Sequence, residues 1–252
     1  MKTAVLRSIQ IGQGIPKVFV PIVERGRGDI LAMGKRLVPM GPDAVEWRAD
    51  FYEDIHDRRA VMDTLGELRL CLRDMPLIFT CRTLGEGGMA DMADEEYAAL
   101  NRAAAASGWA DGIDLELFSH GEHAPGLVDE IRSAGATVIG SCHVTGDVPS
   151  AEEMADMLLR MGDMGADIPK LAVNARCPKD AAALMAATRQ ARDAGIGPVI
   201  TMAVGEQGII SRITGELFGS AATFASVGKG SAPGQLPLGA MREILKRIHE
   251  SI

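Results

Sequence analysis

A lysine stands in the middle of an apolar run, "ADIPKLAV", which spans residues 166–173. Such a run is typical of a strand buried inside a parallel sheet, where an ammonium ion is costly unless it is paired or reaches water. Two interpretations of Lys170 follow. Either it extends its head to the rim of the sheet, the commoner fate of strand lysines, or it is a desolvated nucleophilic amine that forms a Schiff base with a carbonyl substrate.

A histidine ends the apolar run that precedes this lysine along the chain. His143 follows "ATVIGSC" (residues 136–142), and an imidazole can accept and return protons near neutral pH. A lone histidine is more often structural, but the lysine on the next run favours an acid–base role. His120 and His123 have no third ligand at metal-binding spacing, so we interpret them as solvated surface residues.

Short β-rich runs alternate with amphipathic segments along the whole chain, eight of each. Ser150 and Glu153 form a capping box ahead of a methionine-rich apolar stripe that ends at Gly165, and another helix begins at Asp94 and ends at Gly108. A last helix carries Met241, Ile244, Leu245 and Ile248 on one face. The β-rich runs are residues 17–22, 43–48, 76–82, 111–117, 136–142, 168–173, 198–204 and 221–227.

Eight β/α units in a chain of 252 residues match the size of a (β/α)₈ barrel. An open doubly wound sheet would show a GxGxxG motif after its first strand, and none follows residues 17–22. Residues 3–12, "TAVLRSIQIG", alternate in polarity and predict a hairpin that closes the barrel bottom. No linker interrupts the pattern. We therefore predict an α/β fold, a single-domain (β/α)₈ TIM barrel over residues 1–252 with an N-terminal β-hairpin.

The composition narrows the class of protein. A net charge of −8 argues against a nucleic-acid surface, although local arginines could still bind a small anion. No apolar run reaches the length of a signal peptide or a membrane span, so we expect a cytoplasmic protein. The four cysteines show no CxxC spacing, which predicts free thiols and no zinc site.

In barrel enzymes, the chemistry lies at the C-terminal ends of the strands and in the loops that follow them. Glu46 and Arg48 share one face of their strand, either as a hydroxyl-binding fork or as a structural salt bridge. If Lys170 points inward, we expect arginines from neighbouring strands to disfavour its charged form. This rule selects Glu46, Arg48, Arg82, Glu86 (in a flexible loop), His143, Lys170, Met202 and the loop 228–235, "GKGSAPGQ".

An anion pocket is predicted near the end of the chain. Arg212 stands near the start of the helix that follows the seventh strand, and Ser231 with backbone amides of loop 228–235 would complete the pocket. These features do not separate a phosphate from a carboxylate. A Schiff-base aldolase acting on a sugar phosphate is therefore a competing hypothesis.

A series of motifs runs in order along nearly the whole chain: "EWRAD", "FTCRTLGEGG", "IDLELF", "SCHVTGDVPSAEEM", "GADIPKLAV", "ITMAVGEQGIISRITGELFGSAATF" and "SAPGQLP". Together they resemble the type I 3-dehydroquinate dehydratases of the shikimate pathway, which leads to chorismate and the aromatic amino acids. The resemblance implies a (β/α)₈ barrel that is usually a homodimer and needs no metal or organic cofactor. Whether the role is biosynthesis or quinate breakdown stays open.

The resemblance also implies a role for each matching residue. Lys170 would join the ketone carbon of 3-dehydroquinate as a Schiff base, His143 would move the protons, and Glu86 would orient His143. Arg212 would hold the substrate carboxylate, with Ser231 and Gln235 closing over it. Glu46, Arg48 and Arg82 would bind the remaining ring hydroxyls, and Met202 would supply an apolar wall.

Four positions depart from the family pattern. Pro21 stands where a serine is frequent, Cys142 precedes the histidine where Asn or Tyr is common, Thr145 lies in place of an aromatic residue, and Val204 replaces a methionine. These changes leave room for a related cyclic keto acid as the substrate. They also suggest a further alternative, a barrel that keeps the pocket as a ligand sensor. Retention of both Lys170 and His143 weighs against a sensor.

Overall fold

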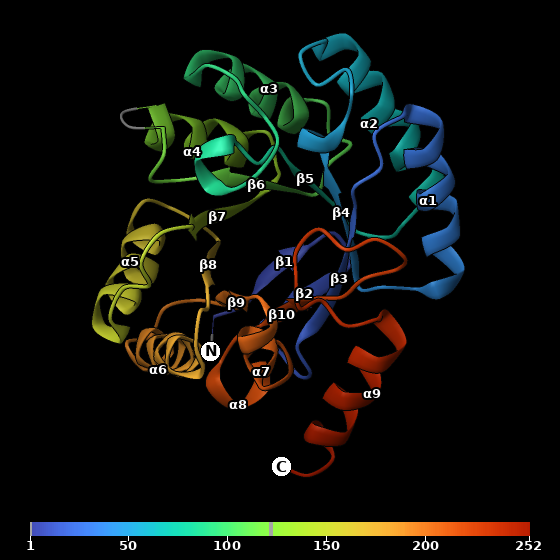
Figure 1. Cartoon of the computed structure of the whole chain (residues 1–252). Coiled ribbons are helices and arrows are strands. Elements are labelled where there is room, and N and C mark those ends of the chain that lie inside the picture. Colours follow the sequence, from blue (N-terminus) through green and yellow to red (C-terminus); the bar gives the residue numbers. More distant parts are fainter. Residues whose placement is uncertain (1, 121–122) are drawn as a thin grey trace.

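The apolar runs fold into parallel strands, because runs that are apolar on both faces are buried by helices on one side and by the barrel interior on the other. The computed structural model describes residues 2–120 and 123–252. One sheet contains, in spatial order, β10 (Ala222–Phe224), β3 (Lys17–Ile22), β4 (Ala44–Arg48), β5 (Leu77–Thr80), β6 (Gly112–Glu116), β7 (Thr137–Val144), β8 (Ile168–Asn174) and β9 (Ile200–Val204). Figure 1 shows these strands as a ring inside a layer of helices.

The two end strands of this sheet meet and nearly close the barrel. Val199 and Ser220 form a parallel bridge, the amide of Ala221 donates to the carbonyl of Val199 at 2.7 Å, and the amide of Thr201 donates to Oγ of Ser220 at 3.0 Å. The predicted eight-stranded barrel is therefore confirmed. The last strand is shorter than predicted, because after Ala225 the chain pairs with the segment before α9 rather than with β3.

Helices follow the strands in sequence, as the alternating pattern predicts. They are α1 (Arg27–Met40), α2 (Arg58–Leu72), α3 (Asp94–Ala106), α4 (His123–Ser133), α5 (Ala151–Asp163), α6 (Pro178–Asp193), α7 (Ile209–Ile213), α8 (Gly215–Phe218) and α9 (Leu238–His249). Short 3₁₀ turns lie at η1 (Ala49–Phe51), η2 (Leu84–Glu86) and η3 (Glu206–Gly208). No helix in the described part of the chain is both long and apolar enough to cross a membrane.

Local signals set where these helices begin and end. Ser150 caps α5, and Glu153 returns its carboxylate to the Ser150 amide, which is the predicted capping box. Gly108, two residues after the end of α3, has a φ of +67°, a conformation that side chains with a Cβ rarely adopt. The apolar stripe of α5 faces the barrel, with Met154 and Met161 fully buried.

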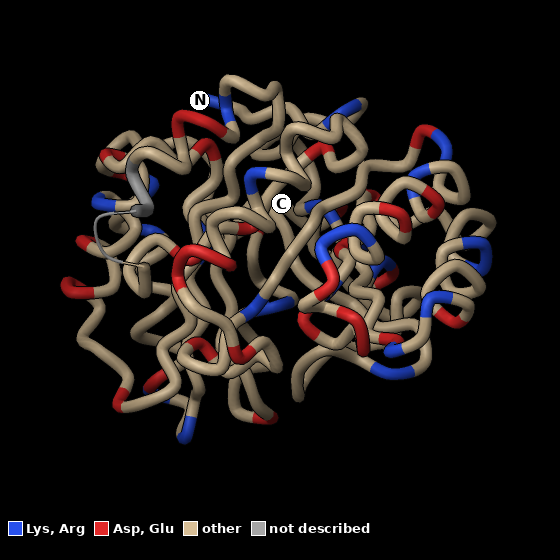
Figure 2. Tube along the Cα trace, turned by 90° about the horizontal axis from the view of Figure 1, so that it is seen from above, with Lys and Arg blue, Asp and Glu red and all other residues tan. Residues whose placement is uncertain are grey.

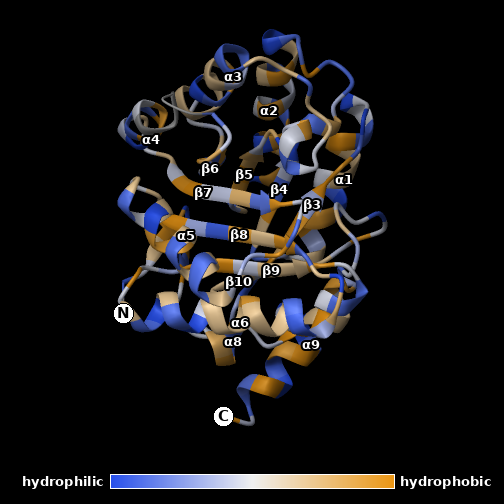
Figure 3. Ribbon diagram, turned by 60° about the vertical axis from the view of Figure 1, so that its left-hand side comes forward, coloured by the Kyte–Doolittle hydropathy of each residue, from blue (hydrophilic) through white to orange (hydrophobic). Residues whose placement is uncertain are grey.

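An N-terminal hairpin closes one end of the barrel, as predicted. β1 (Ala4–Leu6) pairs antiparallel with β2 (Ile9–Ile11), and Leu6 and Ile11 are fully buried among apolar side chains inside the barrel. The opposite end, where the strands have their C-termini, is open. Polar segments interrupt the otherwise apolar β7 and β8 (Figure 3), and Figure 2 shows acidic and basic residues interspersed along the chain trace.

Candidate active site

The ten predicted site residues line one pocket of about 340 Å³ at the C-terminal ends of the strands. They are Glu46, Arg48, Arg82, Glu86, His143, Lys170, Met202, Arg212, Ser231 and Gln235. A hollow of about 680 Å³ lies at the other end of the barrel, but its lining contains no histidine or cysteine. It lies at the N-terminal ends of the strands, the face that contributes to stability and not to catalysis in barrel enzymes. The smaller pocket is therefore the candidate active site.

Lys170 lies inside the barrel and not at its rim, with 4% of its surface exposed. Its Nζ donates to Oδ2 of Asp114 at 2.7 Å, lies 3.5 Å from Oε1 of Glu46, and lies 4.8 Å from the centre of the Phe224 ring. The groups that contact Nζ directly are not the expected arginines, and Arg82 is connected to it only through a shared partner, Asp114. β6 and β4 bring carboxylates to it instead, so the nitrogen is oriented by hydrogen bonds as well as buried.

Asp114 links this lysine to Arg82. Its Oδ1 accepts hydrogen bonds from Nη2 of Arg82 and, at 2.6 Å, from Oγ of Ser141, while Oδ2 accepts from Lys170. Burial opposes ionisation, but the positive charges of Arg82 and Lys170 outweigh it and hold the pKa of Asp114 well below its ordinary value. Asp114 is thus a permanent carboxylate that anchors Lys170.

His143 and Glu86 form a hydrogen-bonded pair beside the lysine. Oε2 of Glu86 lies 2.9 Å from the backbone nitrogen of His143 and 3.0 Å from its Nδ1. Burial, together with the positive charges of Arg82 and Lys170, holds the pKa of His143 well below its ordinary value. The imidazole is therefore neutral near pH 7. When Glu86 is ionised it can only accept, so Nδ1 carries the proton and the lone pair is on Nε2.

The glycines around Glu86 suggested a flexible loop, but Glu86 lies in an ordered turn. It ends the 3₁₀ turn η2 and its side chain is 5% exposed. Burial raises the pKa of Glu86 to about 7, against the attraction of Arg82 and a hydrogen bond from Oγ of Ser119 at 2.6 Å. Its ionisation state therefore changes near neutral pH.

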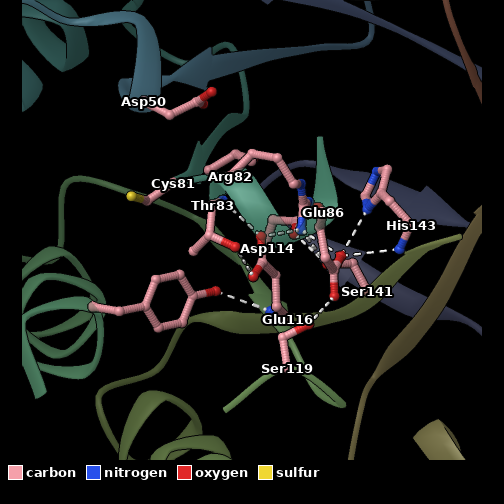
Figure 4. A network of polar contacts seen from close by, with 12 residues as sticks. Asp50, Cys81, Arg82, Thr83, Glu86, Asp114, Glu116, Ser119, Ser141 and His143 are labelled. Carbon is pink, nitrogen blue, oxygen red and sulfur yellow. Dashed lines mark hydrogen bonds and ion pairs between the residues drawn. The ribbon is translucent and has the colours of Figure 1, made fainter. Parts of the chain in front are cut away.

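Arg82 is the centre of a buried polar network (Figure 4). Its Nη1 donates to Oε2 of Glu86 at 3.2 Å, to Oε1 of Glu116 at 3.0 Å and to Oγ of Ser141 at 3.0 Å. Because Nη2 is engaged by Asp114, three carboxylates surround this guanidinium. Arg82 lines the pocket, and it also fixes the position of Glu86.

Glu46 and Arg48 do not form the salt bridge that we considered. Arg48 makes a two-pronged ion pair with Asp50, with both N–O distances at 2.8 Å, and its guanidinium lies 5.0 Å from the centre of the Phe51 ring. Glu46 accepts a hydrogen bond from Oγ1 of Thr80 at 2.9 Å. Each side chain is thus held separately at the wall of the pocket.

Arg212, on α7, is a buried cation that has no carboxylate partner among the described residues. It is 1% exposed, only Nη2 has a described partner, the carbonyl of Pro233 at 3.3 Å, and Nε and Nη1 have none in the described part of the chain. Burial lowers the pKa of Arg212 to about 10, so it remains charged at neutral pH. Because a buried unpaired charge is costly, this site is suited to an anionic ligand.

Ser231 and Gln235 both line the pocket and are hydrogen-bonded to each other. The amide of Ser231 donates to Oε1 of Gln235 at 3.0 Å, and Nε2 of Gln235 donates back to Oγ of Ser231 at 2.9 Å. Met202 is 5% exposed and forms part of the apolar wall. Arg212 and loop 228–235 therefore border one pocket, and their binding of an anion stays a prediction.

Sequence reasoning assigned no role to Asp114 and Glu116, and it was wrong about His120. His120 is 6% exposed, its ring is stacked on Tyr97, and both ring nitrogens contact carboxylates. The side chain of His123 lies outside the described part of the chain. A signal was present in "IDLELF", where two carboxylates share one face of a buried strand and so require buried cationic partners.

Two of the four departures from the family pattern border the pocket. Thr145 and Val204 line it, whereas Pro21 and Cys142 are absent from its lining. Within residues 2–120 and 123–252, no group of three or more histidine, cysteine, aspartate or glutamate side chains is arranged to hold a metal ion. Of the four departures, Thr145 and Val204 are therefore the two that face the pocket.

Comparison with known proteins shows which family this chain resembles. A model described as type I 3-dehydroquinase matches residues 18–252. The 3-dehydroquinate dehydratase of Klebsiella pneumoniae (strain 342) is 42% identical over 241 residues, 95% of this chain and 96% of the relative. The 3-dehydroquinate dehydratase of Bacillus licheniformis is 39% identical over 252 residues, 100% of this chain and 99% of the relative.

A solved structure agrees with these matches. The type I 3-dehydroquinate dehydratase from Clostridium difficile, with covalent modified comenic acid, superposes with a TM-score of 0.95 at 37% identity, covering 100% of this chain and 99% of that one. The 3-dehydroquinate dehydratase from Geobacillus kaustophilus superposes with a TM-score of 0.95 at 34% identity, covering 99% of this chain and 97% of that one. This chain therefore belongs to the type I 3-dehydroquinase family.

Proposed function

We propose that this chain is a type I 3-dehydroquinate dehydratase, a hydro-lyase that removes water from 3-dehydroquinate by syn elimination and forms 3-dehydroshikimate in the shikimate pathway. The observation that carries the proposal is the meeting, in one pocket, of a buried lysine amine with a neutral histidine held by a carboxylate. Dehydration of a ketone with an acidic neighbouring C–H group and a leaving hydroxyl needs both of these side chains: the amine to form an imine, and the imidazole to transfer the protons.

Lys170 is the nucleophile in this scheme. The Lys170 ammonium group first releases one proton, and the neutral amine then attacks the ketone carbon. The carbonyl oxygen takes up that proton and a second one from Nζ and leaves as water, so that an iminium ion links the substrate to Nζ. The iminium accepts electron density, and this makes the adjacent C–H group acidic. Asp114 and Glu46 hold Nζ in place on two sides and balance the positive charge of the iminium.

His143 moves the protons. Nε2 takes the proton from the carbon next to the iminium, and Glu86 stabilises the resulting imidazolium through Nδ1. The electron pair released from the C–H bond forms the new double bond as the hydroxyl leaves, and His143 returns its proton to that hydroxyl, which departs as water. A second water then hydrolyses the imine and frees Lys170.

The remaining pocket residues bind the substrate. The unpaired guanidinium of Arg212 receives the substrate carboxylate, with Ser231 and Gln235 over it. Glu46, Arg48 and Arg82 contact the ring hydroxyls, and Met202 supplies an apolar wall. We further propose that residues 1–252 form one catalytic domain, that the enzyme is a cytoplasmic homodimer, and that it works without a metal or organic cofactor.

A trapping experiment tests this proposal. The protein is incubated with 3-dehydroquinate, reduced with borohydride, and digested for peptide mass spectrometry, while product formation is assayed in parallel. We expect a reduced adduct on Lys170 together with 3-dehydroshikimate. Absence of an adduct on Lys170 would refute the mechanism. An adduct without product would favour a sensor, and turnover of a phosphorylated sugar but not of dehydroquinate would favour an aldolase.

Replacement of the proposed base gives a second test. His143→Ala keeps Lys170 and its partners, so the borohydride adduct should still form, whereas turnover should fall about a hundred- to ten-thousand-fold, the usual contribution of a positioned general base. The matched control is His249→Ala, because His249 is exposed and contacts Glu216 on the outer surface. Turnover unchanged in His143→Ala would remove His143 from the mechanism.

A further inference from the structure

His120 is a buried histidine that lies between two carboxylates. Its Nδ1 lies 2.8 Å from Oδ1 of Asp94, its Nε2 lies 3.1 Å from Oε2 of Glu116, and its ring stacks on Tyr97 with centres 3.9 Å apart. A neutral imidazole has only one N–H, so it can satisfy only one of two flanking carboxylates. The doubly protonated ring donates to both, and the geometry therefore favours an imidazolium.

Glu116 connects this histidine to the pocket. Its Oε1 accepts hydrogen bonds from Nη1 of Arg82 at 3.0 Å and from the amide of Thr83 at 2.8 Å, and its Oε2 accepts from Oγ1 of Thr83 at 2.7 Å. Thr83 is the residue that precedes η2, the turn that carries Glu86. Glu116 therefore holds both the guanidinium and the backbone that place Glu86.

The segment after β6 makes a second connection. Ser119, next to His120 in sequence, donates from Oγ to Oε1 of Glu86 at 2.6 Å. Anchoring of the His120 ring between α3 and β6 therefore fixes the backbone from which Ser119 reaches Glu86. A chain of contacts runs from Asp94 at the start of α3, through His120, Glu116 and Arg82, to Glu86 and His143.

We propose that His120, as an imidazolium between Asp94 and Glu116, is a positioning residue that keeps Glu86 ionised and directed at His143. The proposal rests on the proposed dehydratase function for its kinetic test. Physically, the cation on His120 satisfies Glu116, and Arg82 is then shared with Glu86 instead of being drawn to Glu116. Without that cation, the negative charge of Glu116 acts on Glu86 and favours its protonated form.

The charged groups packed around His120 and around Glu86 support this proposal. His120 faces Asp94 and Tyr97 from α3 and Glu116 from β6; burial opposes its protonation, but the bonds to the two carboxylates outweigh burial and raise its pKa. Glu86 faces Arg82, Glu116, Asp114 and His143, and its pKa, raised by burial to about 7, rises further with each negative charge left uncompensated. Loss of the His120 cation therefore moves Glu86 towards its inactive, protonated form at neutral pH.

The test compares the pH dependence of kcat/KM for 3-dehydroquinate in the native protein and in His120→Gln. The native rate should fall as the pH falls through about 7, because Glu86 becomes protonated. In His120→Gln this fall should begin at higher pH, with a loss of about five- to tenfold at pH 6.5 and about twofold or less at pH 9, since one pH unit corresponds to about tenfold in protonation. A merely structural role would lower the rate equally at every pH, and that result would overturn the proposal.

Two further variants keep the test decisive. Asp94→Asn changes a half-exposed carboxylate, leaves the ring in place, and should shift the profile in the same direction by a smaller amount. His56→Gln is the matched control, because His56 contacts Glu96 at 2.7 Å on the surface, and its profile should superpose on the native one. Profiles of His120→Gln and Asp94→Asn that both superpose on the native profile contradict the proposal.

A measurement without substrate separates this inference from the proposed function. Nuclear magnetic resonance of ¹⁵N-labelled protein should show both ring nitrogens of His120 protonated at pH 7, and the titration of the Glu86 carboxyl should move to higher pH in His120→Gln. If the protein does not form 3-dehydroshikimate but shows both the protonated His120 ring and the shifted Glu86 titration, the dehydratase proposal is refuted and the role of His120 stands. A neutral His120 ring at pH 7 removes that role even if the enzyme is active.

Discussion

The arginines of this pocket differ mainly in whether their N–H groups already have hydrogen-bond and ion-pair partners within the protein. Arg82 has three carboxylate partners, and Arg48 has a two-pronged partner in Asp50. Among the described residues, Arg212 has one carbonyl contact, and two of its donor nitrogens have no partner. Under the proposed function, Arg212 is therefore the arginine that we expect to contribute most to binding of the substrate carboxylate. The two satisfied arginines shape the pocket and hold its acidic residues.

Arg212→Lys tests this view at the scale of one residue. A lysine keeps the charge but loses the planar array of donors, and a hydrogen bond to a charged group contributes about 1.5–3 kcal/mol, so KM for 3-dehydroquinate should rise about tenfold or more. Because Arg212 does not contact Lys170 or His143, kcat should fall less than KM rises. Steady-state kinetics measure both.

Arg189→Lys is the matched control for that substitution. Arg189 pairs with Asp193 on the exposed face of α6, and it lies outside the pocket lining. Its KM should equal that of the native protein. A KM unchanged in Arg212→Lys as well would show that the substrate carboxylate binds elsewhere.

At the scale of elements, the segment between β5 and α3 delivers two site residues in one compact turn. The amides of Gly88 and Ala90 donate back to the carbonyls of Thr83 and Arg82 at 2.8 and 3.1 Å, and the amide of Leu84 donates to the carbonyl of Ala90 at 2.9 Å. These bonds close the turn tightly. Gly88 therefore serves close packing within the turn, and not the flexibility expected from sequence.

Gly88→Ala should disturb this turn and the site together. A Cβ at position 88 would overlap the carbonyl group of Arg82, so the turn must shift and carry Glu86 with it. A displacement of about 1 Å can cost about a hundredfold in rate, and we expect a loss of that order in kcat with native-like circular dichroism. Gly85→Ala is the control, because the nearest atom to its Cβ would be Oγ1 of Thr83 at 3.7 Å. Equal activity in the two variants would contradict this role of Gly88.

On the scale of the whole molecule, the two ends of the barrel have different roles. The hairpin β1–β2 fills the N-terminal end with Leu6 and Ile11, which pack among apolar residues of the inner cluster, while the C-terminal end holds the charged pocket. Substitutions at the hairpin end should therefore alter the stability of the barrel without altering the chemistry of the pocket.

Leu6→Ala tests this separation. Loss of a fully buried leucine should lower the free energy of unfolding by about 2–5 kcal/mol, through lost burial and the cavity that remains. The kcat of the folded variant should be close to the native value, because Leu6 lies at the opposite end from Lys170. Denaturant unfolding and steady-state kinetics give the two quantities. Val5→Ala is the control, since Val5 is 56% exposed, and a similar loss of stability there would argue against the plug.

The sequence by itself determined the elements and the main residues of the site. Period-2 and period-3.6 patterns, caps and glycines are local signals, so the eight strands, the α5 capping box and the hairpin were predictable from neighbours in the chain. The lysine and the histidine were also recognisable, because each is a polar residue in an otherwise apolar strand.

Only the tertiary structure decided which charges meet. Ser141 lies opposite Lys170 in the register of β7 and β8, and Thr80 lies opposite Asp114 in that of β5 and β6, so residues tens of positions apart become neighbours. Pairing across a barrel depends on this register and on side-chain direction, which no single strand encodes. That is why Lys170 was expected among arginines but is held by Asp114, and why His120 was expected at the surface but lies buried between two carboxylates.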